Sequence, residues 1–192
     1  MISIKNLMEF SVVLKTVIND LNQEEVNYGL IGGFALSVSG IVRSTVVIDL
    51  LMLSDDLPKL KTILSRYSYN CVFQNKNISQ YVSELKPFGQ VDVIHAFREA
   101  SVGMLSRKRK VSVLHEQEVN VLQLEDIIGL KLQAIRNDPR REAIDRSDIE
   151  LILKHKHSES HDINWGLIKE YYTLFDGENE LQELISKYGL SE

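Results

Sequence analysis

The chain has 192 residues, of which 44% are hydrophobic and 26% charged, and its formal net charge is −5. This length allows one well-cored domain or a core with a small appendage, and the negative balance argues against a protein that coats long nucleic acid through bulk electrostatics. Charged residues at Glu9, Lys15 and Asp20 interrupt the apolar amino-terminal stretch well before signal-peptide or membrane-span length. The lone Cys71, expected to be buried, offers no internal disulfide. The sequence therefore predicts a cytoplasmic protein without membrane association.

The first two thirds of the chain mixes helical spacing of apolar residues with short β-branched runs, which indicates an α/β (α+β) domain. Glycine-containing turns separate several of these segments. In chain order, the expected elements are a helix over 4–22, a strand over 26–31, a helix over 34–38, a strand over 46–53, a helix beginning near residues 55–56, and strands over 71–73, 79–85, 90–94 and 110–114.

After residue 121 the pattern becomes entirely helical, with apolar side chains recurring every three to four residues. The expected helices cover 122–137, 144–155, 163–175 and 178–188. The change of pattern predicts a core over residues 1–121 and a helical region over residues 122–192 that packs on that core.

Three features of the predicted core point to chemistry. Gly32-Gly33 follows a buried strand, where glycine lets backbone amides approach a phosphate closely, although such a pair is often only a tight turn. Asp49 and Asp92 are each the single acid in an apolar strand, which is costly unless the carboxylate is hydrogen-bonded, paired or bound to a metal. Two such carboxylates near a glycine turn predict a shared cation, and oxygen ligands favour Mg²⁺ or Mn²⁺.

These residues lie in a longer pattern that resembles the signature of the DNA polymerase β-like nucleotidyltransferase superfamily. A later helical pattern is similar to that of AbiEii toxin-like and related nucleotidyltransferases. The matching segments are Tyr28-Gly29-Leu30-Ile31-Gly32-Gly33-Phe34-Ala35, then Gly40, Arg43, Thr45, Ile48-Asp49-Leu50-Leu51 and Asp92, and finally residues 124–134 and 145–149. The resemblance implies a nucleotidyltransferase fold, a mixed β-sheet flanked by helices, followed by a carboxy-terminal helical region.

The resemblance also implies a reaction and a role for each matched residue. A nucleotidyl group would pass from a nucleoside triphosphate, with Mg²⁺ or Mn²⁺, to a hydroxyl of RNA, protein or a small molecule. In that scheme Gly32 and Gly33 line the triphosphate, and Arg43 and Thr45 contact the nucleotide. Asp49 and Asp92 bind metal, and Asp92 also helps to deprotonate the acceptor. Lys131 reaches toward the nucleotide, and Asp148 orients that lysine or caps a helix.

One position departs from the family pattern. The first acid of the Asp-x-Asp motif falls on Val47, which shares a strand face with Asp49 and has no lone pair to offer a metal. Asp55 and Asp56 are too far along the strand to substitute, whereas Glu84 is conceivable as a replacement. The sequence is therefore consistent with a nucleotidyltransferase of weakened or lost activity. The competing hypothesis is an inactive relative that binds a nucleotide or a partner in a toxin–antitoxin-like or regulatory complex, including a homo-oligomer. The sequence does not separate a natural valine at position 47 from a substitution made to inactivate the protein.

Two clusters of basic residues stand out in this acidic chain. One comprises Arg98 with residues 107–110, and the other comprises Arg136, Arg140, Arg141 and Arg146. Most charge runs are solvated faces, but the second cluster surrounds the predicted Lys131 helix and is a candidate for contacts with phosphates or RNA.

Overall fold

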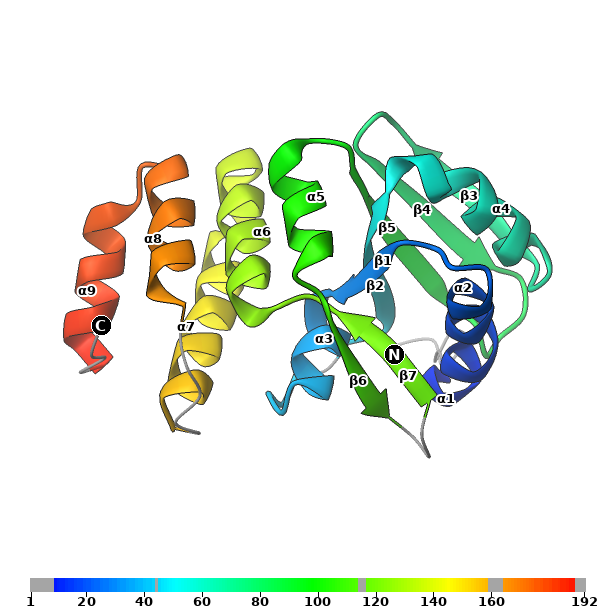
Figure 1. Cartoon of the computed structure of the whole chain (residues 1–192), viewed down its shortest axis with the longest axis horizontal. Helices are drawn as coiled ribbons and strands as arrows, with labels where there is room; N and C mark the ends of the chain where they lie inside the picture. The colour runs from blue at the N-terminus through cyan, green and yellow to red at the C-terminus, as the bar shows by residue number, and fades with distance from the viewer. Residues whose placement is uncertain (1–8, 44, 114–116, 159–163, 189–192) are drawn as a thin grey trace. The chain divides into compact units, whose positions relative to one another are not determined.

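The computed structural model describes residues 9–43, 45–113, 117–158 and 164–188 (Figure 1). The chain divides into two compact units, Met1–Leu122 and Gln123–Glu192. The first contains the sheet, and the second contains helices alone among its described residues.

The first unit is built on a mixed sheet with the strand order β3-β4-β5-β2-β1-β7-β6. The pairs β2–β5 and β1–β7 are parallel, and the other neighbouring strands are antiparallel. The strands are β1 (Tyr28–Ile31), β2 (Val47–Leu53), β3 (Tyr69–Gln74), β4 (Ile78–Ser83), β5 (Gln90–Ala96), β6 (Arg109–Val113) and β7 (Gln117–Val121). The predicted mixed α/β fold is confirmed.

Alternation along β2 gives its two faces different environments. Ile48, Leu50 and Met52 are fully buried, whereas Val47 and Asp49, on the opposite face, are half-buried. The Leu50 face lies under the amino-terminal helices, because Tyr28 shares this face through its pairing with Met52 and its hydroxyl donates to Asn22 Oδ1 of α2 at 2.8 Å. The helices of this unit are α1 (Phe10–Val13), η2 (Leu14–Ile18), α2 (Asn19–Gln23), α3 (Gly32–Val38), η3 (Ser54–Asp56), α4 (Leu57–Ser65) and α5 (Glu99–Ser106).

Three features of this unit differ from the sequence prediction. Helix α5 and strand β7 were not predicted; both are short, and β7 has only Val119 and Val121 as apolar residues. Cys71 is exposed rather than buried. The physical reason is its position on β3, an edge strand in which every residue after Tyr69 is exposed.

The second unit consists of helices whose apolar faces form their own core, with Ile128, Ile149 and Ile168 fully buried. Its helices are α6 (Leu124–Asn137), η4 (Pro139–Arg141), α7 (Glu142–Ser158), α8 (Trp165–Leu174) and α9 (Glu178–Tyr188). The four predicted helices are therefore present, although residue 163, the expected start of the third, lies outside the described residues. Among the described residues, no helix combines the length and apolar character needed to cross a membrane.

Candidate functional site

The parallel pairing of β2 with β5 brings the two isolated aspartates together. Asp49 on β2 is the register partner of Asp92 on β5. Register partners on adjacent strands project from the same face of a sheet, and such strands lie about 4.8 Å apart. Two carboxylates that are distant in the sequence thus become neighbours on the half-buried face of the sheet.

The glycine turn lies directly against this pair. Gly32 has φ +65°, and a Cβ at this position would lie 2.1 Å from Asp49 Oδ2. A Cβ on Gly33 would lie 2.8 Å from Thr45 Cβ. Both glycines are therefore required by close approach, which makes the turn, Thr45 and the Asp49 carboxylate one continuous surface.

Hydrogen bonds fix the loop that leads into β2. The Thr45 hydroxyl donates to the Val47 carbonyl at 3.0 Å and accepts from the Val47 amide at 3.3 Å. The Arg43 carbonyl accepts from Ser37 Oγ of α3 at 2.8 Å. These contacts tie Arg43 to α3 and Thr45 to the first residue of β2.

Asp92 is held by two glutamines that sequence reasoning missed. Gln90 Nε2 donates to Asp92 Oδ1 at 2.7 Å, and Gln80 Nε2 donates to Asp92 Oδ2 at 3.0 Å. Gln80 is the register partner of Asp92 on β4, and Gln90 lies two residues earlier on β5, on the same face. Gln90 could have been found from the sequence, because it is a polar residue two positions before Asp92 in the same strand. Gln80 is identified only by the pairing of β4 with β5.

Among the described residues, no further carboxylate lies beside Val47, where the resemblance led us to expect an acid. Val47 is the register partner of Gln90, so an amide rather than a carboxylate lies beside it. Glu84 is exposed, and its Oε1 accepts from Asn70 Nδ2 at 3.0 Å. No group of three or more His, Cys, Asp or Glu side chains among the described residues is arranged to hold a metal ion. The side chains of Asp49 and Asp92 are oxygen ligands of the kind that would hold Mg²⁺ or Mn²⁺, which proteins commonly bind through one or two carboxylates together with substrate phosphates.

In the second unit, Lys131 of α6 lies in a buried ion-pair network. Its Nζ contacts Asp148 Oδ2 at 2.6 Å and Asp145 Oδ1 at 3.0 Å, and both aspartates are buried on α7. Arg141 Nε reaches Asp145 Oδ2 at 2.9 Å. Asp148 thus contacts Lys131, the residue that it was predicted to orient, and Asp145 is a second partner that was not predicted from the sequence.

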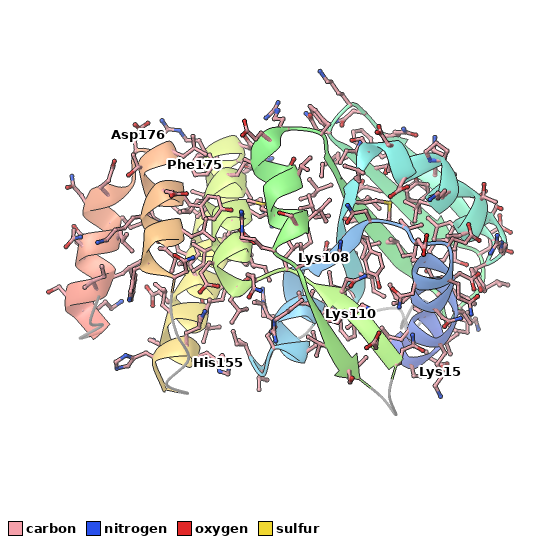
Figure 2. All side chains as sticks on the ribbon, viewed as in Figure 1. Lys15, Lys108, Lys110, His155, Phe175 and Asp176 are labelled. Carbon is pink, nitrogen blue, oxygen red and sulfur yellow. The ribbon has the colours of Figure 1, made fainter. Side chains whose placement is uncertain are left out.

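The basic run over residues 107–110 is divided between different environments. Lys108 lies just before β6 and Lys110 lies within it (Figure 2). Lys108 Nζ donates to the Asn27 carboxamide oxygen, and Lys110 forms an ion pair with Glu118 at 3.1 Å. Burial lowers the pKa of Lys108. Arg109 instead donates to Ser39 Oγ at 2.8 Å. This run is not a uniform basic patch.

The arginines of the second cluster are each engaged by carboxylates, so they do not form a simple basic surface. The ion pairs are Arg136–Asp176 at 3.0 Å, Arg140–Asp138 at 2.8 Å, Arg141–Asp145 at 2.9 Å and Arg146–Glu142 at 2.9 Å, and Arg146 also contacts Glu180.

Comparison with known proteins bears on the fold of the chain. No family model and no curated protein matches the sequence. Among solved structures, the antibiotic-resistance factor ANT(2'')-Ia in solution has a TM-score of 0.65 at 14% identity, with 92% of this chain and 97% of that chain covered. A putative nucleotidyltransferase (TM1012) from Thermotoga maritima has a TM-score of 0.55 at 18% identity, covering 72% and 93%. The lincosamide antibiotic adenylyltransferase LnuA, lincomycin-bound, has a TM-score of 0.53 at 13% identity, covering 77% and 97%. The chain has the nucleotidyltransferase fold.

Proposed function

We propose that this protein binds a nucleoside triphosphate together with Mg²⁺ or Mn²⁺ at the site formed by Asp49, Asp92 and the Gly32-Gly33 turn. The observation that carries the proposal is the in-register pairing of the two aspartates beside that turn. Mg²⁺ is commonly bound through one or two carboxylates plus substrate phosphates, and a close-packed glycine turn leaves room for phosphate oxygens. Arg43 and Thr45, in the loop that follows, would contact the nucleotide.

The proposed reaction transfers a nucleotidyl group to a hydroxyl acceptor and releases pyrophosphate. The bound cation would supply positive charge to the triphosphate. Asp92, oriented by its two glutamines, would accept the proton of the attacking hydroxyl. Because Val47 removes one carboxylate from the site, we expect transfer to be slower by roughly a thousandfold than with a complete set of acids.

A small hydroxyl-bearing molecule is the acceptor class that we favour over RNA. One solved structure of ANT(2'')-Ia contains adenylyl-2''-tobramycin, and that of LnuA contains lincomycin. In this chain, the arginines that were candidates for binding RNA are paired with carboxylates. An RNA or protein acceptor is an alternative outcome of the transfer assay described below.

A second candidate function is a cytoplasmic pseudo-nucleotidyltransferase that binds nucleotide without transferring it. Val47 favours this candidate, because no third carboxylate joins the pair among the described residues. The AbiEii-like motif over 124–134 and 145–149 would assign its partner to a toxin–antitoxin or regulatory complex, or to a second copy of this chain. An apolar docking surface on the last two helices would support such a complex, but on the described parts of α8 and α9 the one strongly exposed large aliphatic side chain is Leu174.

Calorimetry with ATP and Mg²⁺ tests binding, and a labelled-nucleotide assay with candidate acceptors tests transfer. The matched variants are Val47→Asp, which restores the missing acid, and Val46→Asp, which adds the same charge at a neighbouring residue that is 60% exposed. We expect the native protein to bind nucleotide and Val47→Asp to transfer label faster.

The outcomes separate the two candidates. Transfer by Val47→Asp with none by the native protein or by Val46→Asp would identify the native chain as a pseudoenzyme. Absence of nucleotide binding in both the native protein and Val47→Asp would refute the nucleotide proposal itself.

A further inference from the structure

Both oxygens of the Asp92 carboxylate accept hydrogen bonds from neighbouring side chains. Each of its oxygens accepts a hydrogen bond from a glutamine amide, from Gln90 at 2.7 Å and from Gln80 at 3.0 Å. An ionised carboxylate has no proton to donate, so the atom that each glutamine turns toward it is the nitrogen. These are charge-assisted hydrogen bonds, which are stronger than those between neutral groups.

The strand register shows which directions around Asp92 these amides occupy. Gln80 on β4 lies on one side of Asp92, and Asp49 on β2 lies on the other. Gln90 lies along β5, on the side where its register partner is Val47. The β4 side and the Val47 side of the carboxylate are therefore taken by N–H donors, and the direction toward Asp49 is the one that faces another carboxylate.

The chemistry of these neighbours discriminates between cation positions. A cation between Asp49 and Asp92 has carboxylate oxygens on both sides. A cation beside Val47 would meet the methyl groups of valine, which offer no lone pair, and the neutral carboxamide of Gln90, whose nitrogen donates to Asp92. In addition, two directly paired carboxylates repel each other, and the amide donors offset that repulsion where a second cation would otherwise do so.

We infer that this site takes a single divalent cation, bridging Asp49 and Asp92, and that Gln80 and Gln90 are positioning residues that hold Asp92 in place of a second cation. The inference rests on the proposed function for the identity of the site. It concerns the number of ions rather than the occurrence of nucleotidyl transfer.

The test is Mn²⁺ binding, measured by the electron paramagnetic resonance of free Mn²⁺ without nucleotide. The native protein should bind one equivalent, which Asp49→Asn removes. Gln90→Glu places a carboxylate in register with Val47 and should tighten Mn²⁺ binding by about tenfold, the scale on which the surroundings of a metal site alter affinity. Gln23→Glu is the matched control, because Gln23 is exposed on α2, in the layer that covers the opposite face of the sheet.

A second readout follows the glutamines directly. The side-chain amide resonances of Gln80 and Gln90 should shift when Mg²⁺ is added to the native protein, and those of Gln23 should not. A change at both glutamines would show that they sense a ligand on Asp92, which a purely structural pair remote from the ion would not do.

Several outcomes would overturn the inference. The first is binding of two Mn²⁺ ions by the native protein, both of which are lost in Asp49→Asn. The second is no binding of Mn²⁺ by the native protein. The third is an Mn²⁺ affinity of Gln90→Glu equal to that of Gln23→Glu. Each differs from failure of the proposed function, which is judged by nucleotide binding. A protein that binds ATP with two site-bound ions would retain the proposed function and refute the single-cation inference.

Discussion

Replacing Gly32 with alanine should damage the fold and the site together. Alanine at φ +65° carries strain of about 1–2 kcal/mol, because Cβ crowds the backbone in the left-handed region. The new Cβ would also lie 2.1 Å from Asp49 Oδ2 and 2.7 Å from its Cγ, so the carboxylate must move away from the turn. Relieving an overlap of that kind in a packed region costs about 1–3 kcal/mol. We expect Gly32→Ala to lower the free energy of unfolding by about 3 kcal/mol.

Gly33→Ala is the matched control at the next residue. Its backbone is not left-handed, but its Cβ would lie 2.8 Å from Thr45 Cβ, so the backbone that carries Thr45 must move. The overlap should cost about 1–3 kcal/mol without the added backbone strain of Gly32→Ala, and the restriction that alanine places on the unfolded chain offsets about 0.4–1 kcal/mol of that loss. Urea unfolding followed by far-ultraviolet circular dichroism measures both variants, and Mn²⁺ titration measures the effect on Asp49. If Gly32→Ala were as mild as Gly33→Ala and left Mn²⁺ affinity unchanged, the argument from close approach would be wrong.

Other variants test the surrounding chemistry. Tyr171→Phe should lower the free energy of unfolding in urea by about 2 kcal/mol, because its hydroxyl donates to the fully buried Asp126 at 2.6 Å. Tyr172→Phe should instead raise the free energy of unfolding by up to about 1 kcal/mol, since that hydroxyl is buried without a hydrogen bond to the described residues and its removal relieves a desolvation cost. Lys131→Met leaves two buried aspartates of α7 facing each other and should cost about 3 kcal/mol in the same assay. Burial raises the pKa of Tyr28 to about 12, whereas the unfolded value is about 10. Its contribution to stability is therefore complete below pH 10 and is lost as the pH rises through 12, a loss that Tyr28→Phe should reduce in pH-dependent unfolding.

The strands that carry the site could be predicted because their signal is local. β-Branched and apolar residues flank Asp49 and Asp92, so both strands were found with nearly the bounds that the structure shows. Gly32 approaches Asp49 closely because β1 pairs with β2. In the sequence, the only sign of this approach is that residue 32 is a glycine. A single acid in an apolar strand and a glycine pair after a buried strand are thus the two signals from which the site was predicted.

The partners of those acids could not be predicted, because they depend on which strands are neighbours. Gln80 contacts Asp92 because β4 lies beside β5 in an antiparallel register, and a glutamine in a strand carries no sign of this. Strand β7 was missed for a related reason. It is short and alternates polar and apolar residues, yet it lies in the interior of the sheet order between β1 and β6. The exposure of Cys71 likewise follows from β3 being an edge strand, which is a property of the sheet and not of the segment.

Val47 and the glutamine pair act on the same electrostatic problem. Carboxylates that share one face of two paired strands repel each other, and in a metal-dependent site the cations cancel that repulsion. Here valine removes one negative charge, and two amides stabilise another. Both features lower the electrostatic repulsion in the metal-free protein. They also weaken the attraction of the site for cations. Restoring an acid at position 47 should therefore raise the affinity for divalent cations while lowering the stability of the metal-free protein, because both effects arise from one added charge.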